Sequence, residues 1–220
     1  MLSVVNLRNE SAVFPDVCHK LIKLKRKMEF TEKRRCAWCG NDPLYMAYHD
    51  EEWGVPVYDD DTLFEFLILE TFQAGLSWIT ILRKRENFRK AFDNFDYKKI
   101  AAYGEEKYLS LLQDVGIIRN KLKIKATITN AQAFMKVQEE FGSFSKYIWQ
   151  FTNGKPIQNA FSNRHDVPAT TEISDKLSKD LKKRGFKFVG STVIYAHMQA
   201  TGMVNDHTTS CFRYSELKNT

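Results

Sequence analysis

The chain has 220 residues, of which 43% are hydrophobic and 13% aromatic, so it can bury the core of one domain or of two closely packed lobes. Lys and Arg number 33 against 27 Asp and Glu, giving a net charge of +6 and a pI of about 9.0. This bias favours polyanionic partners without identifying one. No apolar run is long enough to span a membrane and no secretory signal is visible, so we expect a cytoplasmic protein, by default a monomer.

Residues 1–33 differ in composition from the rest of the chain. They contain a basic run from His19 to Lys27 but no cluster of chemically active side chains. We interpret them as a loosely ordered basic extension; the alternative is a short basic helix that adds to nucleic-acid affinity. Residues 34–220 then form a single domain of two packed helical lobes.

Four side chains near the two ends of this domain have the chemistry of a metal site. Cys36 and His49 lie in one short stretch, and His207 and Cys211 lie close together near the C-terminus. The second pair is spaced by four residues, so the two side chains share a face if the segment is helical. Two Cys and two His are a closed tetrahedral set for structural Zn²⁺. We predict one zinc ion, and its four protein ligands argue against the alternative, a zinc hydrolase.

The predicted elements are helices. Thr62 and Glu65 form a predicted capping box at the start of a helix whose residues 63–69 are apolar on nearly every side, which indicates a central, buried helix. Glu70 ends this run. Burying an unpaired carboxylate is costly, so Glu70 needs a partner, and its neighbours favour a ligand pocket over a surface salt bridge.

Further along, Ser77 is predicted to cap a helix that begins with Trp78, and Asp96 to cap a short one. Apolar spacing predicts a long helix over 119–140, which Gly142 ends. Its first turns carry three lysines that we place on a solvated face: Lys121, Lys123 and Lys125.

Two helices are predicted near the C-terminus, over 175–184, capped by Ser174, and over 192–201. The short turn between them holds Lys187 and Gly190. Such a unit can direct backbone N–H groups at a phosphate, and the lysine adds positive charge. No stretch predicts a series of strands, so the fold class is all-α.

Four segments, in the same order, resemble one known family. They are DPLYMAYHDEEWG at 42–54, QAGLSW at 73–78, KKRGFKFVG at 182–190, and VNDH at 204–207 followed by Cys211. The chain resembles the DNA-3-methyladenine glycosylase I family over residues 35–211. The resemblance implies a helical fold of the helix-hairpin-helix glycosylase superfamily, with a structural zinc joining the N- and C-terminal segments of the domain.

The resemblance also implies roles for individual residues. The zinc ligands it implies are the four residues already identified from their chemistry: Cys36, His49, His207 and Cys211. The base pocket falls on Glu70, Tyr48 and Trp78, with Tyr45 nearby. Glu70 acts in recognition first and in catalysis second. Gly75 and Leu76 fill the gap left by an extruded nucleotide, while Lys187 and Gly190 contact the DNA.

Two positions depart from the wider superfamily. Thr192 stands where strand-cleaving enzymes carry a lysine, which leaves no evident Schiff-base nucleophile. The superfamily's catalytic Asp falls on Asn205, and Asp206 lies one residue away, expected to point elsewhere on a helix. We therefore expect a monofunctional enzyme that flips and releases 3-methyladenine from double-stranded DNA containing alkylated purines. The alternative is a zinc-stabilised DNA-binding module without catalytic activity.

Overall fold

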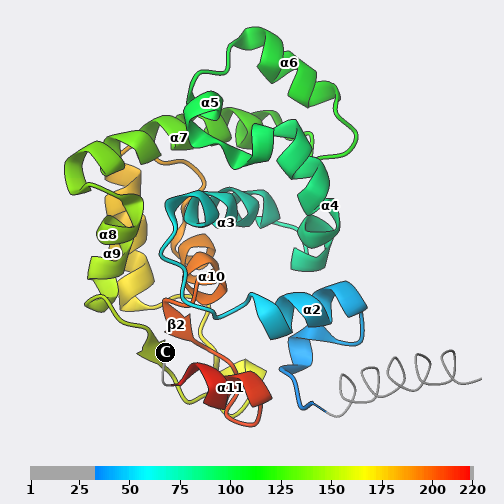
Figure 1. Cartoon of the computed structure of the whole chain (residues 1–220), viewed down its shortest axis with the longest axis vertical. Helices are drawn as coiled ribbons and strands as arrows, with labels where there is room; N and C mark the ends of the chain where they lie inside the picture. The colour runs from blue at the N-terminus through cyan, green and yellow to red at the C-terminus, as the bar shows by residue number, and fades with distance from the viewer. Residues whose placement is uncertain (1–32, 219–220) are drawn as a thin grey trace, which may run out of the picture. The chain divides into compact units, whose positions relative to one another are not determined.

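The computed structural model describes residues 33–218 of the chain (Figure 1). Contacts within the chain separate the unit that begins at Arg35 from the residues before it. The predicted basic extension, residues 1–33, lies almost entirely outside the described residues, and its loosely ordered state stays a prediction. Within residues 33–218, no helix combines the length and the apolar composition that crossing a bilayer requires.

The described part of the chain is mostly helical, as predicted. Its helices are α2 (Pro43–Glu51), α3 (Asp60–Gln73), α4 (Trp78–Ala91), α5 (Tyr97–Ala101), α6 (Glu105–Gln113), α7 (Lys121–Phe141), α8 (Phe144–Trp149), α9 (Glu172–Lys183), α10 (Ser191–Ala200) and α11 (Phe212–Leu217). Short 3-10 helices cover Ala37–Cys39, Asp93–Phe95, Gln150–Thr152 and Arg164–Asp166. Two strands of two residues each, β1 (Ile157–Gln158) and β2 (Val204–Asn205), pair in parallel.

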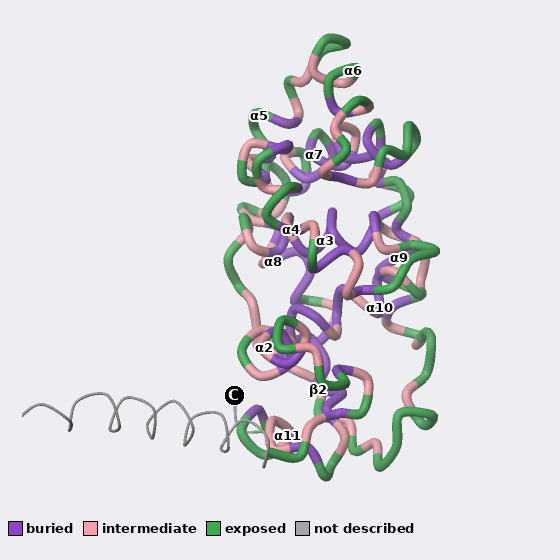
Figure 2. Tube along the Cα trace, turned by 90° about the vertical axis from the view of Figure 1, so that its right-hand side faces the viewer, coloured by how far each residue is buried: buried purple, intermediate pink, exposed green. Residues whose placement is uncertain are grey.

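Helix α3 is the buried centre of this arrangement. It lies between α7 and α10 in Figure 1, and buried residues follow one another along it in Figure 2. Every residue from Leu63 to Phe72 is buried except Glu65. Phe64 packs edge-on against Phe134 of α7, with ring centroids 5.0 Å apart. The predicted central helix is therefore confirmed, and its burial follows from an apolar surface on every side.

The start of α3 differs from the prediction. Asp59 is the N-cap, and its carboxylate accepts a hydrogen bond from the backbone N–H of Thr62 at 2.8 Å. Glu65 does not complete a capping box. It instead binds Arg85 and Arg89 of α4, at 2.5 and 2.8 Å. Because Asp59 begins the helix three residues earlier, Glu65 lies more than a turn inside it and faces the neighbouring helix.

Other helix ends follow the sequence more closely. Asp96 caps α5 through two backbone N–H groups, and Gly142 ends α7 in the left-handed region at φ 84°. Ser77 precedes α4 as predicted, but its side chain makes no capping hydrogen bond. Ser174 is not an N-cap: it is the third residue of α9, where it completes a capping box with Thr171.

A buried lysine of α7 holds the turn that follows α3. The Nζ of Lys123 donates hydrogen bonds to the carbonyl oxygens of Phe72 and Ala74, at 2.8 and 2.7 Å. These carbonyls lie at the C-terminal end of α3, where a positive charge is favourable. Burial lowers the pKa of Lys123. The predicted solvated face is thus wrong for Lys123, whereas Lys121 and Lys125 are exposed.

Helices α9 and α10 form the predicted pair with a short connection. The connection is fixed on two sides. The Asn130 side chain of α7 accepts from the backbone N–H of Lys187 at 2.7 Å and donates to its carbonyl at 3.1 Å. The Ser178 hydroxyl of α9 donates to the carbonyl of Val189 at 2.6 Å. Buried polar side chains therefore hold this connection in one conformation.

Lys123→Met is expected to lower the free energy of unfolding by about 1–3 kcal/mol, because two buried carbonyl groups lose their donor. Lys121→Met, an exposed position at the start of the same helix, serves as the control and should change stability little. Urea denaturation followed by circular dichroism measures both. Equal stability of the two variants would contradict the structural role of the Lys123 ammonium.

Candidate functional site

The structure brings together all four predicted metal ligands. Ligand atoms of Cys36, His49, His207 and Cys211 lie within 4.8 Å of one another, and all four residues are buried. The Sγ atoms of Cys36 and Cys211 are each 3.5 Å from Nδ1 of His207, and Sγ of Cys211 is 3.4 Å from Nε2 of His49. A tetrahedral zinc ion with ordinary bond lengths separates sulfur and nitrogen ligands by roughly 3.5 Å. The group therefore fits such an ion.

The second pair of candidate ligands comes together, but not by the helical spacing considered for it. His207 and Cys211 do not share a helix; they lie in the turn between β2 and α11. The backbone N–H of Cys211 donates to the carbonyl of Thr208 at 2.7 Å, and this tight turn brings the sulfur back beside the imidazole. A four-residue spacing is compatible with a turn as well as with a helix.

Neighbouring groups orient both imidazoles toward the centre of the cluster. Nδ1 of His49 is 2.8 Å from a carboxylate oxygen of Asp50, and Nε2 of His207 is 3.0 Å from the carbonyl oxygen of Trp53. Arg35 in turn binds Asp50 at 2.6 Å. The other ring nitrogens, Nε2 of His49 and Nδ1 of His207, face the sulfur atoms. Outer partners of this kind fix the ring orientation of metal-binding histidines.

A hydrogen bond between the two thiols of the cluster shifts their pKa values in opposite directions. A hydrogen bond with Cys36, together with others from His207 and His49, holds the pKa of Cys211 far below its usual value. The same bond between the thiols, and burial, raise the pKa of Cys36. Cys39 is not part of the four-ligand group: its thiol donates to the carbonyl of Cys36 at 3.2 Å, and burial raises its pKa to about 11.

Glu70, in the last turn of α3, is 4% exposed. Its Oε2 atom has no hydrogen-bond partner within the described residues. Burial raises the pKa of this carboxyl to about 8. Since burying an unpaired polar group is unfavourable, the oxygen is suited to a partner that arrives with a ligand.

Aromatic side chains from two other helices meet beside this carboxyl. The rings of Tyr48 in α2 and Trp78 in α4 have centroids 5.3 Å apart and are tilted by 44°. Burial raises the pKa values of Tyr48 and Tyr45, and the negative charge of Glu70 raises both further. Nε1 of Trp78 is a second buried atom without a partner in the described part of the chain. The structure thus brings the predicted base-pocket residues into one neighbourhood.

Trp38 was missed by the sequence analysis, and it connects the two groups. Its ring centroid lies 5.0 Å from that of Tyr45 and 6.3 Å from that of Tyr48. It also lies 5.3 Å from His49 and 4.9 Å from Trp53. The sequence signal that could have identified it is its position between Cys36 and Cys39. Trp38 therefore packs against a candidate metal ligand, His49, and against the aromatic rings beside Glu70.

The residues predicted to contact DNA lie in two connections, one between α3 and α4 and the other between α9 and α10. Helix α7 contacts both connections. Gly75 has a φ of 83°, and Leu76 is 41% exposed in the turn between α3 and α4. Lys187 is exposed, and Gly190 is the N-cap of α10. Helix α7 reaches the first connection through Lys123 and the second through Asn130, as described above.

Asn205 and Asp206 do not lie on a helix, contrary to expectation. Asn205 belongs to β2, and Asp206 follows it in the turn toward His207. The Asp206 carboxylate accepts hydrogen bonds from Tyr195, Asn159 and a glutamine of α10, at 2.6, 2.7 and 2.8 Å. These bonds tie together three segments of the chain, which indicates a structural role.

Comparison with known proteins identifies the family of this fold. The family model described as methyladenine glycosylase matches residues 38–214. The chain belongs to the methyladenine glycosylase family. DNA-3-methyladenine glycosylase 1 of Escherichia coli (strain K12) is 51% identical over 180 residues, 82% of this chain and 96% of that protein. DNA-3-methyladenine glycosylase of Haemophilus influenzae (strain ATCC 51907 / DSM 11121 / KW20 / Rd) is 48% identical over 177 residues, 80% and 96% of the two chains.

Solved structures of methyladenine glycosylases have the same fold. A crystal structure of 3-methyladenine DNA glycosylase I superimposes with a TM-score of 0.80 at 52% identity, covering 81% of this chain and 98% of the other. The Staphylococcus aureus enzyme, described with the structural basis of its 3-methyladenine recognition, gives 0.79 at 37% identity, covering 81% and 95%. The resemblance is confirmed, and with it the prediction of an enzyme of this N-glycosyl hydrolase family.

Glu70→Gln is expected to remove a pH-dependent loss of stability. The pKa of Glu70 is raised from an ordinary 4.5 to about 8 by folding, so the folded state keeps a proton that the unfolded state releases between these values. The free energy of unfolding of the unsubstituted chain therefore falls as the pH rises through this window, by up to roughly 1.4 kcal/mol per pH unit. The variant should be the more stable at pH 8, and the two should be equal near pH 4.5.

Urea unfolding at a series of pH values measures this difference. Glu51→Gln is the matched control, because Glu51 is an exposed carboxylate on α2, and it should leave the pH profile unchanged. If the Glu70→Gln variant retained the profile of the unsubstituted chain, Glu70 would not be the buried carboxyl described above.

Proposed function

We propose that the chain acts in base-excision repair as a monofunctional, monomeric glycosylase that hydrolyses the N-glycosidic bond of 3-methyladenine in double-stranded DNA. The observation that carries this proposal is the buried, unpartnered carboxyl oxygen of Glu70 beside the rings of Tyr48 and Trp78. Membership of the methyladenine glycosylase family supports it, as do relatives whose names specify DNA-3-methyladenine.

The chemistry of the damaged base explains this set of side chains. 3-Methyladenine in DNA is cationic and its glycosidic bond is already weak, so the enzyme needs little acid catalysis. Its main tasks are to extrude the nucleotide, to hold the base and to exclude normal adenine. Stacking on Tyr48 and Trp78 contributes about 1–3 kcal/mol per base, and a cationic ring gains further attraction from an aromatic face.

Glu70 supplies the discrimination between damaged and normal bases. With its pKa raised to about 8, the carboxyl is largely protonated near neutral pH when no cation is beside it. A cationic base entering the site favours the ionised carboxylate, which then accepts a hydrogen bond from the amino edge of the base. Neutral adenine brings no positive charge, so it does not offset the cost of a buried carboxylate. We therefore assign Glu70 to recognition first and to catalysis second.

The rest of the proposed site prepares the DNA for this step. Leu76 on its exposed turn fills the gap left by the flipped nucleotide, and Gly75 allows the turn its positive φ. The α9–α10 pair acts as a helix-hairpin-helix unit that contacts the backbone through Lys187 and the N-terminus of α10 at Gly190. Thr192 supplies no amine, so the reaction leaves the strand unbroken.

The four-ligand cluster holds a structural zinc ion in this proposal. Cys36, His49, His207 and Cys211 provide four ligands, which leaves no position for a reacting water. Bound there, the ion links the start of the domain to its end and contributes on the order of 10 kcal/mol to folding. Through Trp38, the same cluster supports the aromatic wall beside Glu70.

Incubation of the purified protein with methylated duplex DNA is expected to release 3-methyladenine without strand breakage, because the proposed base-binding residues lie together and no lysine stands at the Schiff-base position. Chromatography of the released bases and electrophoresis of the DNA measure both results. The Glu70→Ala variant should lose most of its affinity for free 3-methyladenine in a calorimetric titration, since it lacks the carboxyl oxygen that accepts a hydrogen bond from the amino edge of the base.

The Glu51→Ala variant serves as the control for that titration and should bind the base normally. If a folded, zinc-loaded protein released no base, the alternative of a DNA-binding module without catalysis would hold. Unchanged affinity of the Glu70→Ala variant would remove Glu70 from the base pocket.

Cys211→Ser is expected to abolish stoichiometric zinc binding and to lower the melting temperature sharply, since the chain then lacks a ligand of its closed set. Cys39→Ser is the matched control: another buried thiol beside the cluster is removed, but the four ligands stay intact, so one zinc per chain is expected. Metal content by mass spectrometry and thermal unfolding measure both. Loss of zinc in the Cys39→Ser variant would show that the ligand set is wrong.

A further inference from the structure

We propose that Arg85 is a positioning residue for the base-binding site, because its guanidinium group holds three helices at the spacing that a flipped base requires. Those helices are α2, α3 and α4, which carry Tyr48, Glu70 and Trp78. This inference rests on the proposed function, since it assigns a role to a residue behind the same site. Neither the motifs nor the residue chemistry of the sequence gave Arg85 a function.

Arg85 is a buried cation that connects all three helices. It is 8% exposed and belongs to α4. Its Nε donates to a carboxylate oxygen of Glu65 in α3 at 2.5 Å, and its Nη1 donates to Glu52, the C-cap of α2, at 2.6 Å. Burial alone would lower the pKa of Arg85, but the two carboxylates raise it, so the group stays charged. A planar guanidinium can bridge two carboxylates in fixed directions, which an ammonium group does not reproduce.

The residues around Arg85 form a second layer behind the base-binding side chains. On α2, Glu52 follows Tyr48 by four residues, and its backbone N–H donates to the carbonyl of Tyr48 at 3.0 Å. On α3, Phe66 precedes Glu70 by four residues. On α4, Arg85 follows the tryptophan that begins the helix by seven residues. Side chains at these spacings share one face of a helix. The second layer therefore lies one or two turns from the base-binding side chain on each helix.

The ring of Phe66 connects the two layers. Cζ of Arg85 lies 5.2 Å from the centroid of this ring, a cation–π contact. The Phe66 ring lies 6.5 Å from that of Tyr48, and the Tyr48 ring lies 5.3 Å from that of Trp78. Close-packed rings leave little room for rotation. A displacement of the guanidinium group therefore changes the angle between the two rings that are proposed to hold the base.

The pair formed by Arg85 and Glu52 acts by position rather than by charge. Burial is the main cause of the raised pKa of Tyr48; the charge of Glu52 raises this pKa further, and the charge of Arg85 lowers it. The two charges thus oppose each other at the Tyr48 ring. Removal of either partner leaves the other charge without its compensation in a largely buried setting, so the helices that the pair joins rearrange. The substitution Arg85→Lys, which keeps the charge but not the bridge, is expected to disturb the site.

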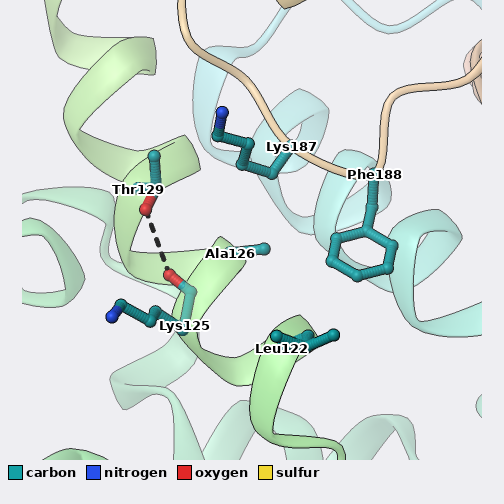
Figure 3. Close-up of a pocket in the computed structure, with 6 residues that line it drawn as sticks. All are labelled: Leu122, Lys125, Ala126, Thr129, Lys187 and Phe188. Atoms are coloured by element: carbon teal, nitrogen blue, oxygen red, sulfur yellow. Dashed lines mark hydrogen bonds between the residues drawn. The ribbon is translucent and has the colours of Figure 1, made fainter.

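The same device occurs in another part of the fold and supplies a matched control. Arg184, the C-cap of α9, binds Glu140 of α7 at 2.6 Å and Asp180 of α9 at 2.7 Å, and its Cζ lies 4.8 Å from the centroid of the Phe141 ring. Helix α7 and the connection that follows α9 border the hollow drawn in Figure 3. None of the six residues that line this hollow belongs to α2, α3 or α4. Arg184 therefore joins helices that carry none of the base-binding side chains.

The experiment titrates free 3-methyladenine into the full chain and its variants by calorimetry, after circular dichroism has shown that each is folded at the temperature used. Arg85→Lys and Glu52→Gln should each weaken base binding about 3- to 10-fold, part of the effect of losing one stacking surface. The variant with both substitutions should bind no more weakly than the weaker of the two, because both remove the same bond. Arg184→Lys should lose stability and bind the base normally.

A second measurement needs no ligand. In protein labelled with fluorotryptophan, the fluorine resonance of Trp78 is identified by its absence from the spectrum of Trp78→Phe. This resonance should shift in Arg85→Lys and in Glu52→Gln but not in Arg184→Lys. Glu52 has a side chain that is 40% exposed, so its variant decides the test if Arg85→Lys does not fold.

The two measurements separate this inference from the proposed function. If Arg85→Lys and Glu52→Gln bound the base as Arg184→Lys does, Arg85 would only stabilise the fold and the inference would be wrong. If the unsubstituted chain bound no 3-methyladenine, the proposed function would fail, and the Trp78 resonance alone would decide the role of Arg85: an unshifted resonance contradicts it.

Discussion

The constraint on which the rest of the site depends is a carboxyl group buried on the central helix, α3. Helix α3 buries every side chain from Leu63 to Phe72 except Glu65, yet one of them, Glu70, has an oxygen that no described residue satisfies. Folding alone does not favour such a group, and the raised pKa reflects that cost. The surrounding structure must therefore supply stability elsewhere. The zinc ion proposed for the cluster that joins residues 36–49 to 207–211 is the feature with sufficient strength to do so.

The metal cluster and the carboxyl are also connected by packing. Trp38 contacts His49 on one side and Tyr45 and Tyr48 on the other. Tyr48 in turn meets Trp78, the first residue of the helix that follows α3. Rings packed in this way are held at fixed angles, because close-packed interiors leave little room for rearrangement. Orienting the histidines therefore also orients the aromatic surfaces on which a base is proposed to stack.

Residue chemistry allowed much of the site to be predicted, whereas the supporting contacts escaped prediction. The four proposed zinc ligands stood out because two short pairs of Cys and His make a complete tetrahedral zinc set. The capping box at Thr62 failed because Glu65 finds Arg85 and Arg89 on another helix, and no local pattern contains that information. Lys123 was misplaced for the same reason: its partners are carbonyls 49 and 51 residues away. Helix propensity and apolar spacing predict where a helix lies, but contacts with other elements decide which of its polar side chains are buried.

The two proposed binding regions divide recognition into separate physical tasks. The region beside Glu70 distinguishes bases by charge and does not require the duplex. The connection between α9 and α10 is proposed to contact the backbone, which is the same for every base. The affinity for DNA and the selectivity for a damaged base are then independent of each other, unless the turn that carries Leu76 connects the two regions. Lys123 provides a route for such coupling, because it fixes that turn from α7, the helix whose Asn130 also holds the connection between α9 and α10. Contact with the backbone can therefore favour the turn conformation in which the base leaves the stack, while the charge of the base decides whether it stays in the pocket.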